Sequence, residues 1–341
     1  MVACANPATG ASFCLDVGMA RTRLYRGGRL EAEDFPLDDI SEHLKDPGTV
    51  IWLDLTDPDR ADYDRVQEEF GLHRLAIEDA SSPRERPKLS HYAKHVFFNA
   101  YAIDFDAAAG DLDVHEVSAF ATERALITAH AADFDIDAVV ERWDATAELA
   151  GHGVAYLAHG LLDVVVDGQF DAVQELDEAL EALEDRLFDE SPQAIRQVQQ
   201  RSFRLRKSLG RMRKVVLPMR ELVNGLTRAR EHLVDDVMLP YYHDLYDHVL
   251  RVTEFTESLR DFTATILESN LAVQGNRQNS IMKKVTSWAA IIAVPTAVTG
   301  YYGQNLPFPG YEKHYGFLTS AVLIVLLSVG LYVTFKRKDW L

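Results

Sequence analysis

The sequence predicts a mixed α/β domain, followed by a long-helix stalk and two transmembrane helices. Short β-rich runs alternate with helical runs up to about residue 160, which is typical of an α/β domain. Beyond that point apolar residues recur every three or four positions, as on one face of a helix. Two apolar runs lie near the C-terminus. The expected boundaries are a flexible tail over 1–11, the α/β domain over 12–160, the stalk over 161–280, a first membrane helix over 281–304, an outer loop over 305–315, and a second membrane helix with a basic tail over 316–341.

Composition excludes several classes of protein. The 341 residues carry a net charge of −18, which excludes a nucleic-acid binder that works through a broad basic surface. An apolar content of 47% excludes a mostly disordered chain. Only two cysteines occur, Cys4 and Cys14, so a disulfide-stapled fold and a four-cysteine zinc module are excluded as well.

Strand and helix signals alternate in the α/β domain. Runs rich in β-branched and aromatic residues predict strands, and two of these runs flank a Thr-Glu-Arg turn as in a hairpin. The expected strands are 49–55, 95–103, 117–121 and 125–129, and the expected helices are 59–70 and 135–149.

The stalk begins with an acidic helix and continues with a basic one. Residues 163–190 contain eleven acids and one basic residue, Arg186. A new helix is expected at Ser191-Pro192, and nine basic residues follow between Arg196 and Arg220. This pattern indicates an antiparallel helix pair with complementary charge. Its charged faces are either ordinary solvated surfaces, with ion pairs of little energy, or a surface that concentrates cations.

The last stalk helix is expected to run unbroken from about 241 to 303. Its apolar stripe ends near Ile266, and a polar tract follows from Glu268 to Ser280. A long helix that turns polar just before a membrane is unusual for packing alone. It would make sense if several copies surrounded an aqueous funnel.

Residues 316–335 contain no charge, and twenty helical residues span about 30 Å, the thickness of a bilayer core. The alternative, a buried helix of a soluble protein, rarely lacks every charge over this length. The weaker run 285–302 contains Pro295, which is expected to kink it. Basic residues precede the first predicted span and follow the second, whereas the connecting loop has one Lys and one Glu. The positive-inside rule therefore places both chain ends in the cytoplasm. The flanking basic residues are Lys283, Lys284, Lys336, Arg337 and Lys338.

One face of the first membrane helix carries small or weakly polar side chains. This face is either a tight helix–helix seam or a narrow pore lining. Its residues are Asn279, Met282, Thr286, Ala289, Ala293, Thr296 and Gly300.

The segment Tyr302-Gly303-Gln304-Asn305 closes this helix, and the chain ends in Lys-Arg-Lys-Asp-Trp-Leu. Together with the hairpin, these motifs resemble the CorA-type divalent-cation transporters, whose signature at this place is Tyr-Gly-Met-Asn. The resemblance covers nearly the whole chain from about residue 12. Further matching segments are His73–Asp79, Arg86–Lys88, Pro240–Tyr242, Asp244–His248, Asn279 and Met282-Lys283.

The resemblance implies a funnel-shaped homopentamer in which the first membrane helix lines the pore. Gly303 and Asn305 would offer neutral oxygens to a hydrated ion, and Met282 and Val285 would form a hydrophobic constriction. It further implies an intersubunit Mg²⁺ site at Asp79 and Asp244, which would keep the pore shut when filled. The resemblance also suggests Glu268 as an additional pore site and Glu312 as the outer-loop acid. Gln304 replaces the family's methionine, so the motif does not fix which ion is transported.

The favoured function is passive, metal-gated Mg²⁺ uptake driven by the membrane potential, with Mg²⁺ as both transported and regulatory ion, and no enzyme activity. The alternatives are a Zn²⁺, Co²⁺ or Ni²⁺ transporter, in one version proton-coupled, and a non-conducting, membrane-anchored cytosolic sensor. Residues 279–306 contain no His, Cys, Asp or Glu, which disfavours a dehydrating zinc site. The expected partners are copies of the chain and membrane lipid. Neither nucleic acid nor nucleotide is expected, because no Gly-rich phosphate loop occurs.

Overall fold

The structure is a computed structural model that describes residues 20–82, 86–187, 189, 191–228, 233–304, 310–311 and 313–341. The expected tail over 1–11 lies outside these residues, as do both cysteines. The chain forms two compact units. The first contains the described residues up to Asp185 together with Arg196–Ala264, and the second contains those of Arg186–Ile195 together with Thr265–Leu341. The expected domain boundaries remain a proposal.

A seven-stranded sheet forms the centre of the first unit, in the order β2-β1-β3-β7-β6-β5-β4. Only β3 and β7 pair in parallel, and the other neighbours are antiparallel. All four predicted strands are confirmed, and each is longer than expected. The strands are β1 (Ala20–Arg26), β2 (Arg29–Glu33), β3 (Thr49–Thr56), β4 (Lys88–His91), β5 (His95–Asp106), β6 (Asp111–Thr122) and β7 (Ala125–His130).

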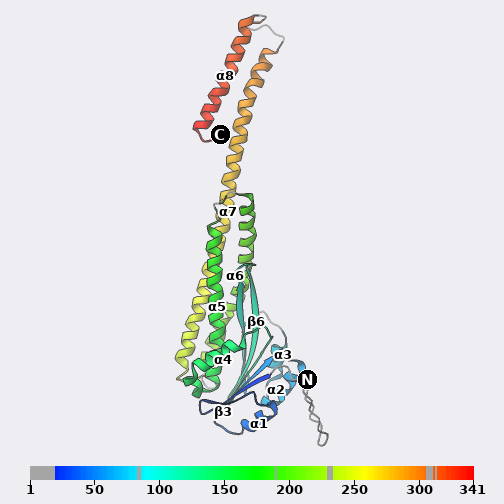
Figure 1. The fold of residues 1–341 in the computed structure, drawn as a ribbon, viewed down its shortest axis with the longest axis vertical. Helices are drawn as coiled ribbons and strands as arrows, with labels where there is room; N and C mark the ends of the chain where they lie inside the picture. The colour runs from blue at the N-terminus through cyan, green and yellow to red at the C-terminus, as the bar shows by residue number, and fades with distance from the viewer. Residues whose placement is uncertain are drawn as a thin grey trace, which may run out of the picture. The chain divides into compact units, whose positions relative to one another are not determined.

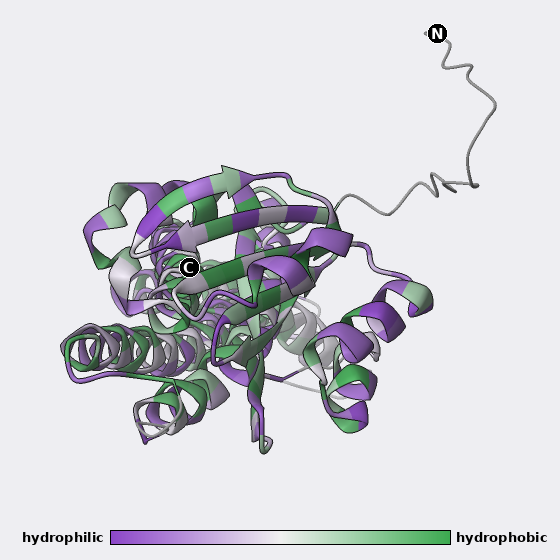
Figure 2. Ribbon diagram, turned by 90° about the horizontal axis from the view of Figure 1, so that it is seen from below, coloured by the Kyte–Doolittle hydropathy of each residue, from purple (hydrophilic) through white to green (hydrophobic). Residues whose placement is uncertain are grey.

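Helices cover both faces of this sheet (Figure 1). Hydrophobic and hydrophilic positions alternate along its strands, as strand geometry requires (Figure 2). In β3, Ile51 and Leu53 belong to the core shared with α2 (Arg60–Phe70) and α3 (Arg74–Ser81). On the opposite face the Trp52 ring packs edge-on against Trp143 of α4 (Ile136–Ala145), with ring centroids 4.8 Å apart. The α5 helix (Val154–Glu184) lies against β5 on that face, where the Gln169 amide donates to the Tyr101 carbonyl oxygen at 2.8 Å.

Local signals explain where these helices begin and end. Asp59 caps α2 through a reciprocal capping box with Asp62, and Gly71 ends it in the left-handed conformation, φ +63°. The predicted helix 135–149 ends earlier, at Ala145. There the Thr146 hydroxyl donates to the Arg142 carbonyl oxygen, and the chain continues as the 3₁₀ segment η2 (Ala147–His152). Two short elements, η1 (Leu37–Asp39) and α1 (Ile40–His43), precede β3.

Long helices make up the rest of the first unit. α6 spans Pro192–Arg228, and α7 spans Leu239–Tyr302, which confirms the unbroken helix predicted through Pro295. The apolar stripe of α7 is buried at Leu245, Val249, Val252, Leu259 and Ile266. Three buried threonines on α7 donate to the carbonyl oxygen four residues earlier, so none leaves an unpaired hydroxyl in the core. They are Thr253, Thr256 and Thr263.

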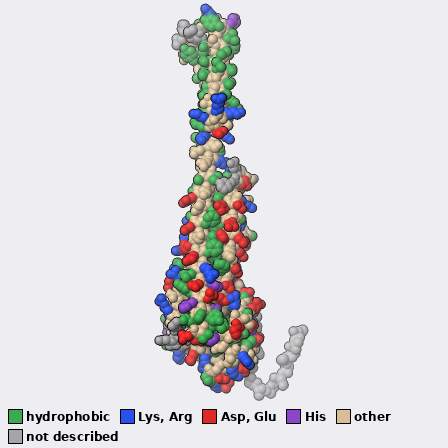
Figure 3. All heavy atoms as spheres, turned by 90° about the vertical axis from the view of Figure 1, so that its left-hand side faces the viewer, with side chains coloured by type: hydrophobic (Ala, Val, Ile, Leu, Met, Phe, Trp, Pro, Cys, Tyr) green, Lys and Arg blue, Asp and Glu red, His purple; other side chains and the backbone are tan. Residues whose placement is uncertain are grey.

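The second unit contains the C-terminal part of α7 and α8 (His314–Arg337), and both helices are long and apolar enough to cross a membrane. Figure 3 shows their apolar side chains, with Lys and Arg gathered at one end of the apolar section. The least exposed positions of α8 recur every three or four residues and form one stripe. That stripe is Gly316, Ser320, Ala321, Ile324, Ser328, Leu331 and Phe335.

Candidate ion pathway and metal-binding residues

The predicted pore face of α7 is exposed along its whole length in the single chain. Its buried counterparts are Ser287 and Val298, eleven residues apart and therefore on one helix face. At 100° per residue the predicted face lies about half a turn from them. Packing within the chain thus covers one side of α7 and leaves the opposite side uncovered. The exposed residues are Asn279, Met282, Val285, Thr286, Ala289, Ala293, Thr296 and Gly300.

The helix ends where the signature motif begins. The Gly303 amide donates to the Thr299 carbonyl oxygen at 2.8 Å, and the Gln304 amide donates to that of Tyr301 at 3.3 Å. Tyr302 is the last helical residue. Asn305 and Glu312, two predicted site residues, lie outside the described residues, so their roles remain predictions.

The chain enters α8 through a tight glycine contact. A Cβ added at Gly316 would lie 2.4 Å from the Gly310 carbonyl oxygen, and Gly310 itself has φ +99°. Only glycine tolerates both conditions. The small residues at these two positions therefore fix how α8 begins.

All five predicted basic residues are exposed on the second unit. Lys336 lies over the Tyr332 ring, with its Nζ 5.7 Å from the ring centroid. The Trp340 ring stacks on Phe335 at 5.6 Å, which anchors the C-terminal turn. The positive charge of Lys283, Lys284, Lys336, Arg337 and Lys338 is thus held at the ends of the two candidate spans.

Asp79 lies on α3 and is buried, with its side chain only 8% exposed. The Lys88 ammonium donates to its Oδ2 from the start of β4. A buried carboxylate without a cation would be costly, so Lys88 supplies the charge that the fold needs at this position. Any metal ion that binds Asp79 must compete with this ammonium.

Asp244 and Glu268 have different surroundings from Asp79. Both lie on α7 and are exposed; the Asp244 side chain is 71% exposed. His248, one turn further along, places its Nε2 3.7 Å from Asp244 Oδ2. No described residue of the chain buries these two carboxylates, as expected of groups that would act at a subunit interface or in a funnel.

One group in the described part of the chain has the spacing of a metal site. Asp163 and Asp167 on α5 and His248 on α7 place one ligand atom each within 4.8 Å of one another. Neither Asp79 nor Asp244 belongs to this group, although Asp244 contacts His248. Two carboxylates suit Mg²⁺, and an added imidazole suits Zn²⁺, Co²⁺ or Ni²⁺.

Arg142 already offsets part of the negative charge of this group. Its guanidinium forms ion pairs with both Asp163 and Asp167, the latter at 2.6 Å. The neighbouring His159 is neutral near pH 7, because burial lowers its pKa more than Asp163 and the Tyr241 carbonyl raise it. Sequence reasoning missed this cluster, although the spacing of the two aspartates, four apart on one helix, was a usable signal.

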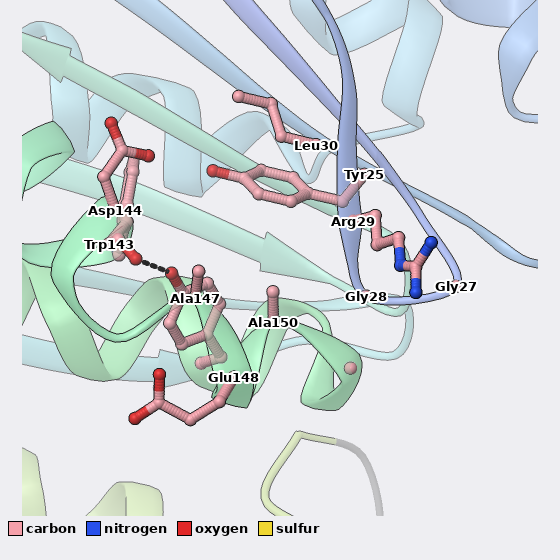
Figure 4. Close-up of a pocket in the computed structure, with 12 residues that line it drawn as sticks. Tyr25, Gly27, Gly28, Arg29, Leu30, Trp143, Asp144, Ala147, Glu148 and Ala150 are labelled. Carbon is pink, nitrogen blue, oxygen red and sulfur yellow. Dashed lines mark hydrogen bonds between the residues drawn. The ribbon is translucent and has the colours of Figure 1, made fainter.

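Figure 4 shows a cavity of about 540 Å³ between the β1–β2 turn and the α4–η2 segment. Most of its polar groups already form hydrogen bonds within the chain. The Asp144 carboxylate accepts two hydrogen bonds from Arg23, at 2.9 and 3.0 Å, and the Tyr156 hydroxyl donates to the Trp143 carbonyl oxygen. This cavity therefore offers little for a ligand to bind.

Comparison with known proteins places these features in one family. The sequence model described as "CorA-like Mg2+ transporter protein" matches residues 47–337. The chain is 29% identical to the cobalt/magnesium transport protein CorA of Thermotoga maritima over 317 residues, which cover 91% of this chain and 90% of the relative. It is 22% identical to the zinc transport protein ZntB of Yersinia enterocolitica, over 85% of this chain and 87% of that protein.

The fold is that of a solved full-length relative. The structure of the CorA magnesium transporter from Methanocaldococcus jannaschii matches with a TM-score of 0.79 at 20% identity, covering 95% of this chain and 99% of that one. An α/β domain, a long helix and two apolar C-terminal helices are therefore common to both. Because the family model spans most of the sequence, the chain belongs to the CorA-like Mg²⁺ transporter family.

Proposed function

We propose that the protein is a passive channel for divalent cations in the cell membrane, with Mg²⁺ as the transported ion. Membership of the CorA-like family carries this proposal. The α/β domain and both chain ends lie in the cytoplasm, as the basic flanks of the two spans favour. An inside-negative potential drives a doubly charged ion inward by about 4–5 kcal/mol per 100 mV, so no chemical energy source is required.

The pore forms where copies of α7 meet around an axis. The uncovered face of α7, opposite the buried Ser287 and Val298, supports this arrangement, since a lone helix would leave it without a partner. Five copies form the ring, as the family resemblance implies. Neutral oxygens from Gly303 and Asn305 hold the hydrated ion at the outer mouth, because Mg²⁺ releases its water reluctantly.

Cytosolic Mg²⁺ closes the channel through Asp79 and Asp244 of neighbouring subunits. The exposure of Asp244 supports a role between chains, and the burial of Asp79 beside the Lys88 ammonium supports a need for positive charge at that carboxylate. When the metal ion dissociates, Lys88 forms the ion pair with Asp79. Asp244 then has no bridging cation, and the contact between subunits in the ring loosens.

Ion flux into proteoliposomes tests the transport function. We expect potential-driven Mg²⁺ uptake that exceeds Zn²⁺ uptake, and a loss of Mg²⁺ uptake in Asn305→Ala. Equal flux with and without Asn305 would remove the outer-mouth assignment, and faster Zn²⁺ flux would favour the ZntB-like alternative. A chain that conducts neither ion would be the sensor considered above.

A double variant tests the gate. Asp79→Asn with Asp244→Asn should conduct at internal Mg²⁺ concentrations that close the wild type. Normal closure in this variant would disprove metal gating at these residues without affecting the transport assignment.

A further inference from the structure

A second cavity, of about 760 Å³, opens at the edge of the α/β domain. The turn between β4 and β5, the turn between β6 and β7, and the end of α2 line it. Its lining is partly apolar and aromatic, through Leu44, Phe70, Tyr92 and Val96, and partly polar. The size lies within the range of pockets that bind small organic molecules.

Arg124 holds an uncompensated positive charge at this cavity. Its Nη1 donates to the Leu44 and Asp46 carbonyl oxygens, at 2.7 and 3.1 Å, which fixes the guanidinium. No carboxylate of the described residues pairs with it, although the chain carries 53 acids against 35 basic residues. The guanidinium is half-buried, and its Nε and Nη2 remain for a ligand. Such a planar, preorganised fork matches the oxygens of phosphate.

Lys94 adds a second cation from the neighbouring turn. It lines the same cavity, is exposed, and has no acceptor within the part of the chain that is described. The cavity also has two acids, Glu69 and Glu123, but neither forms an ion pair with Arg124 or Lys94 among the described residues. The Glu69 carboxylate accepts from the Ser41 hydroxyl, and Glu123 is exposed, where solvent and salt screen its charge as they screen that of Lys94.

His95 gives the cavity wall an unused polar group. It is only 4% exposed, and both of its ring nitrogens lack a hydrogen-bond partner among the described residues. Burial lowers its pKa to about 4, so the ring is neutral near pH 7 and presents one donor and one acceptor. Tyr92 stacks over it at 4.9 Å, between His95 and His73.

We propose that this cavity binds a small organic phosphate of about the size of a nucleoside phosphate. The phosphate group binds Arg124 and Lys94, and the organic part lies against the Leu44, Phe70 and Tyr92 wall, where a shift of Tyr92 brings it to His95. A bare phosphate ion would satisfy the two cations but would leave the apolar wall uncovered. The site uses side chains from two turns and needs no Gly-rich loop, so it departs from the sequence-based expectation that no nucleotide binds.

Calorimetric titration of the full-length protein in detergent tests this site, with ADP and inorganic phosphate as separate probes. EDTA removes divalent ions, so the result does not depend on whether the chain conducts Mg²⁺. Lys94→Gln removes a cation that makes no hydrogen bond or ion pair within the described residues, and should therefore leave the fold intact. We expect it to weaken ADP binding about tenfold, as loss of one charge-assisted contact predicts. Lys207→Gln, an exposed lysine of α6 outside the cavity, is the matched control and should bind ADP as the wild type does.

Two further variants test the phosphate-binding part and the organic-binding part of the site separately. Arg124→Gln should weaken both probes, and thermal unfolding without ligand separates this effect from the loss of its two carbonyl contacts. His95→Phe keeps the ring volume and should weaken ADP binding while leaving phosphate binding unchanged. The proposal is wrong if neither probe binds at millimolar concentration, if Lys94→Gln binds ADP like the wild type, or if Lys207→Gln loses as much. Equal affinity for ADP and phosphate would overturn the organic part of the assignment.

Discussion

A buried His–Asp pair joins β3 and β7 at the centre of the sheet. His130 Nε2 lies 3.1 Å from Asp54 Oδ2, and His130 Nδ1 lies 2.7 Å from the Ala131 carbonyl oxygen. Both partners are acceptors, so both ring nitrogens must donate, which only the protonated imidazole can do. Burial alone lowers the pKa of His130, but the hydrogen bond and the charge of Asp54 outweigh it, and the net pKa is raised.

Stability of the α/β domain should therefore fall as pH rises. The folded-state pKa of His130 exceeds the unfolded value of about 6.5, so its contribution is complete below that pH and is lost as pH rises through the folded pKa. Urea unfolding from pH 6 upward, followed by circular dichroism, measures this loss. His130→Gln should lower stability at pH 6 and flatten the decline. An unchanged decline in this variant would assign the pH dependence to other groups.

Lys88 should stabilise the fold and oppose metal binding at Asp79. Lys88→Met leaves a carboxylate that is 8% exposed without its ammonium partner and should cost about 1–3 kcal/mol in urea unfolding. Added Mg²⁺ should restore more stability to this variant than it gives the wild type, because the Lys88 ammonium then no longer competes for Asp79.

The control for this comparison is Lys45→Met. Lys45 pairs with Glu42 at the surface, where both side chains are at least 70% exposed. Its loss should change neither stability nor the Mg²⁺ response measurably. Identical Mg²⁺ responses in Lys88→Met and the wild type would show that Asp79 does not bind the ion.

At the scale of elements, α4 and α5 pack closely because α5 has a glycine at their contact. A Cβ added at Gly160 would lie 2.5 Å from two atoms of the Trp143 ring. Trp143 is completely buried, and its indole N–H donates to the Leu157 carbonyl oxygen at 3.0 Å. The ring therefore has little room to move.

Gly160→Ala should destabilise the first unit by about 1–3 kcal/mol through overpacking. Gly168→Ala on the same helix is the matched control, since its Cβ would meet only the Ile103 carbonyl oxygen at 4.0 Å. That change should be neutral or stabilising by up to about 1 kcal/mol, because alanine favours the helix. Urea midpoints compare the two. Equal destabilisation by the two variants would mean that the loss does not come from a clash with Trp143.

At the scale of the whole molecule, the proposed ring makes the uncovered face of α7 a contact between copies. Cysteine cross-linking in membranes tests this after Cys4→Ser and Cys14→Ser. Thr296→Cys lies on the uncovered face and should form disulfide-linked dimers on oxidation. Val298→Cys lies on the buried face and should not. Cross-linking at 298 alone would mean that copies meet through the opposite side of the helix.

Much of the architecture could be predicted from the sequence, because helices and membrane spans produce local, periodic patterns of apolar residues. The 3–4 spacing predicted α7 through Pro295, and the uncharged run 316–335 predicted α8. Capping chemistry at Asp59 and the turn at Thr122–Ala125 have equally local causes. The family signature carried the functional prediction, since Gly303 and Asn305 indicate a transporter only in combination with the two predicted membrane helices.

Charge partnerships between residues far apart in the chain depended on the tertiary structure, unlike local pairs such as Lys45 with Glu42. No spacing rule brings Arg142 to Asp163 and Asp167, because the packing of α4 on α5 makes that contact. The same holds for Arg124, which pairs with no carboxylate in the described part of the chain although Glu123 precedes it. The sequence by itself determined which segments are helical, apolar or basic. Only the folded chain decided which charges are neutralised and which remain for a ligand, because electrostatic energy depends on distance and burial in space rather than on position along the chain.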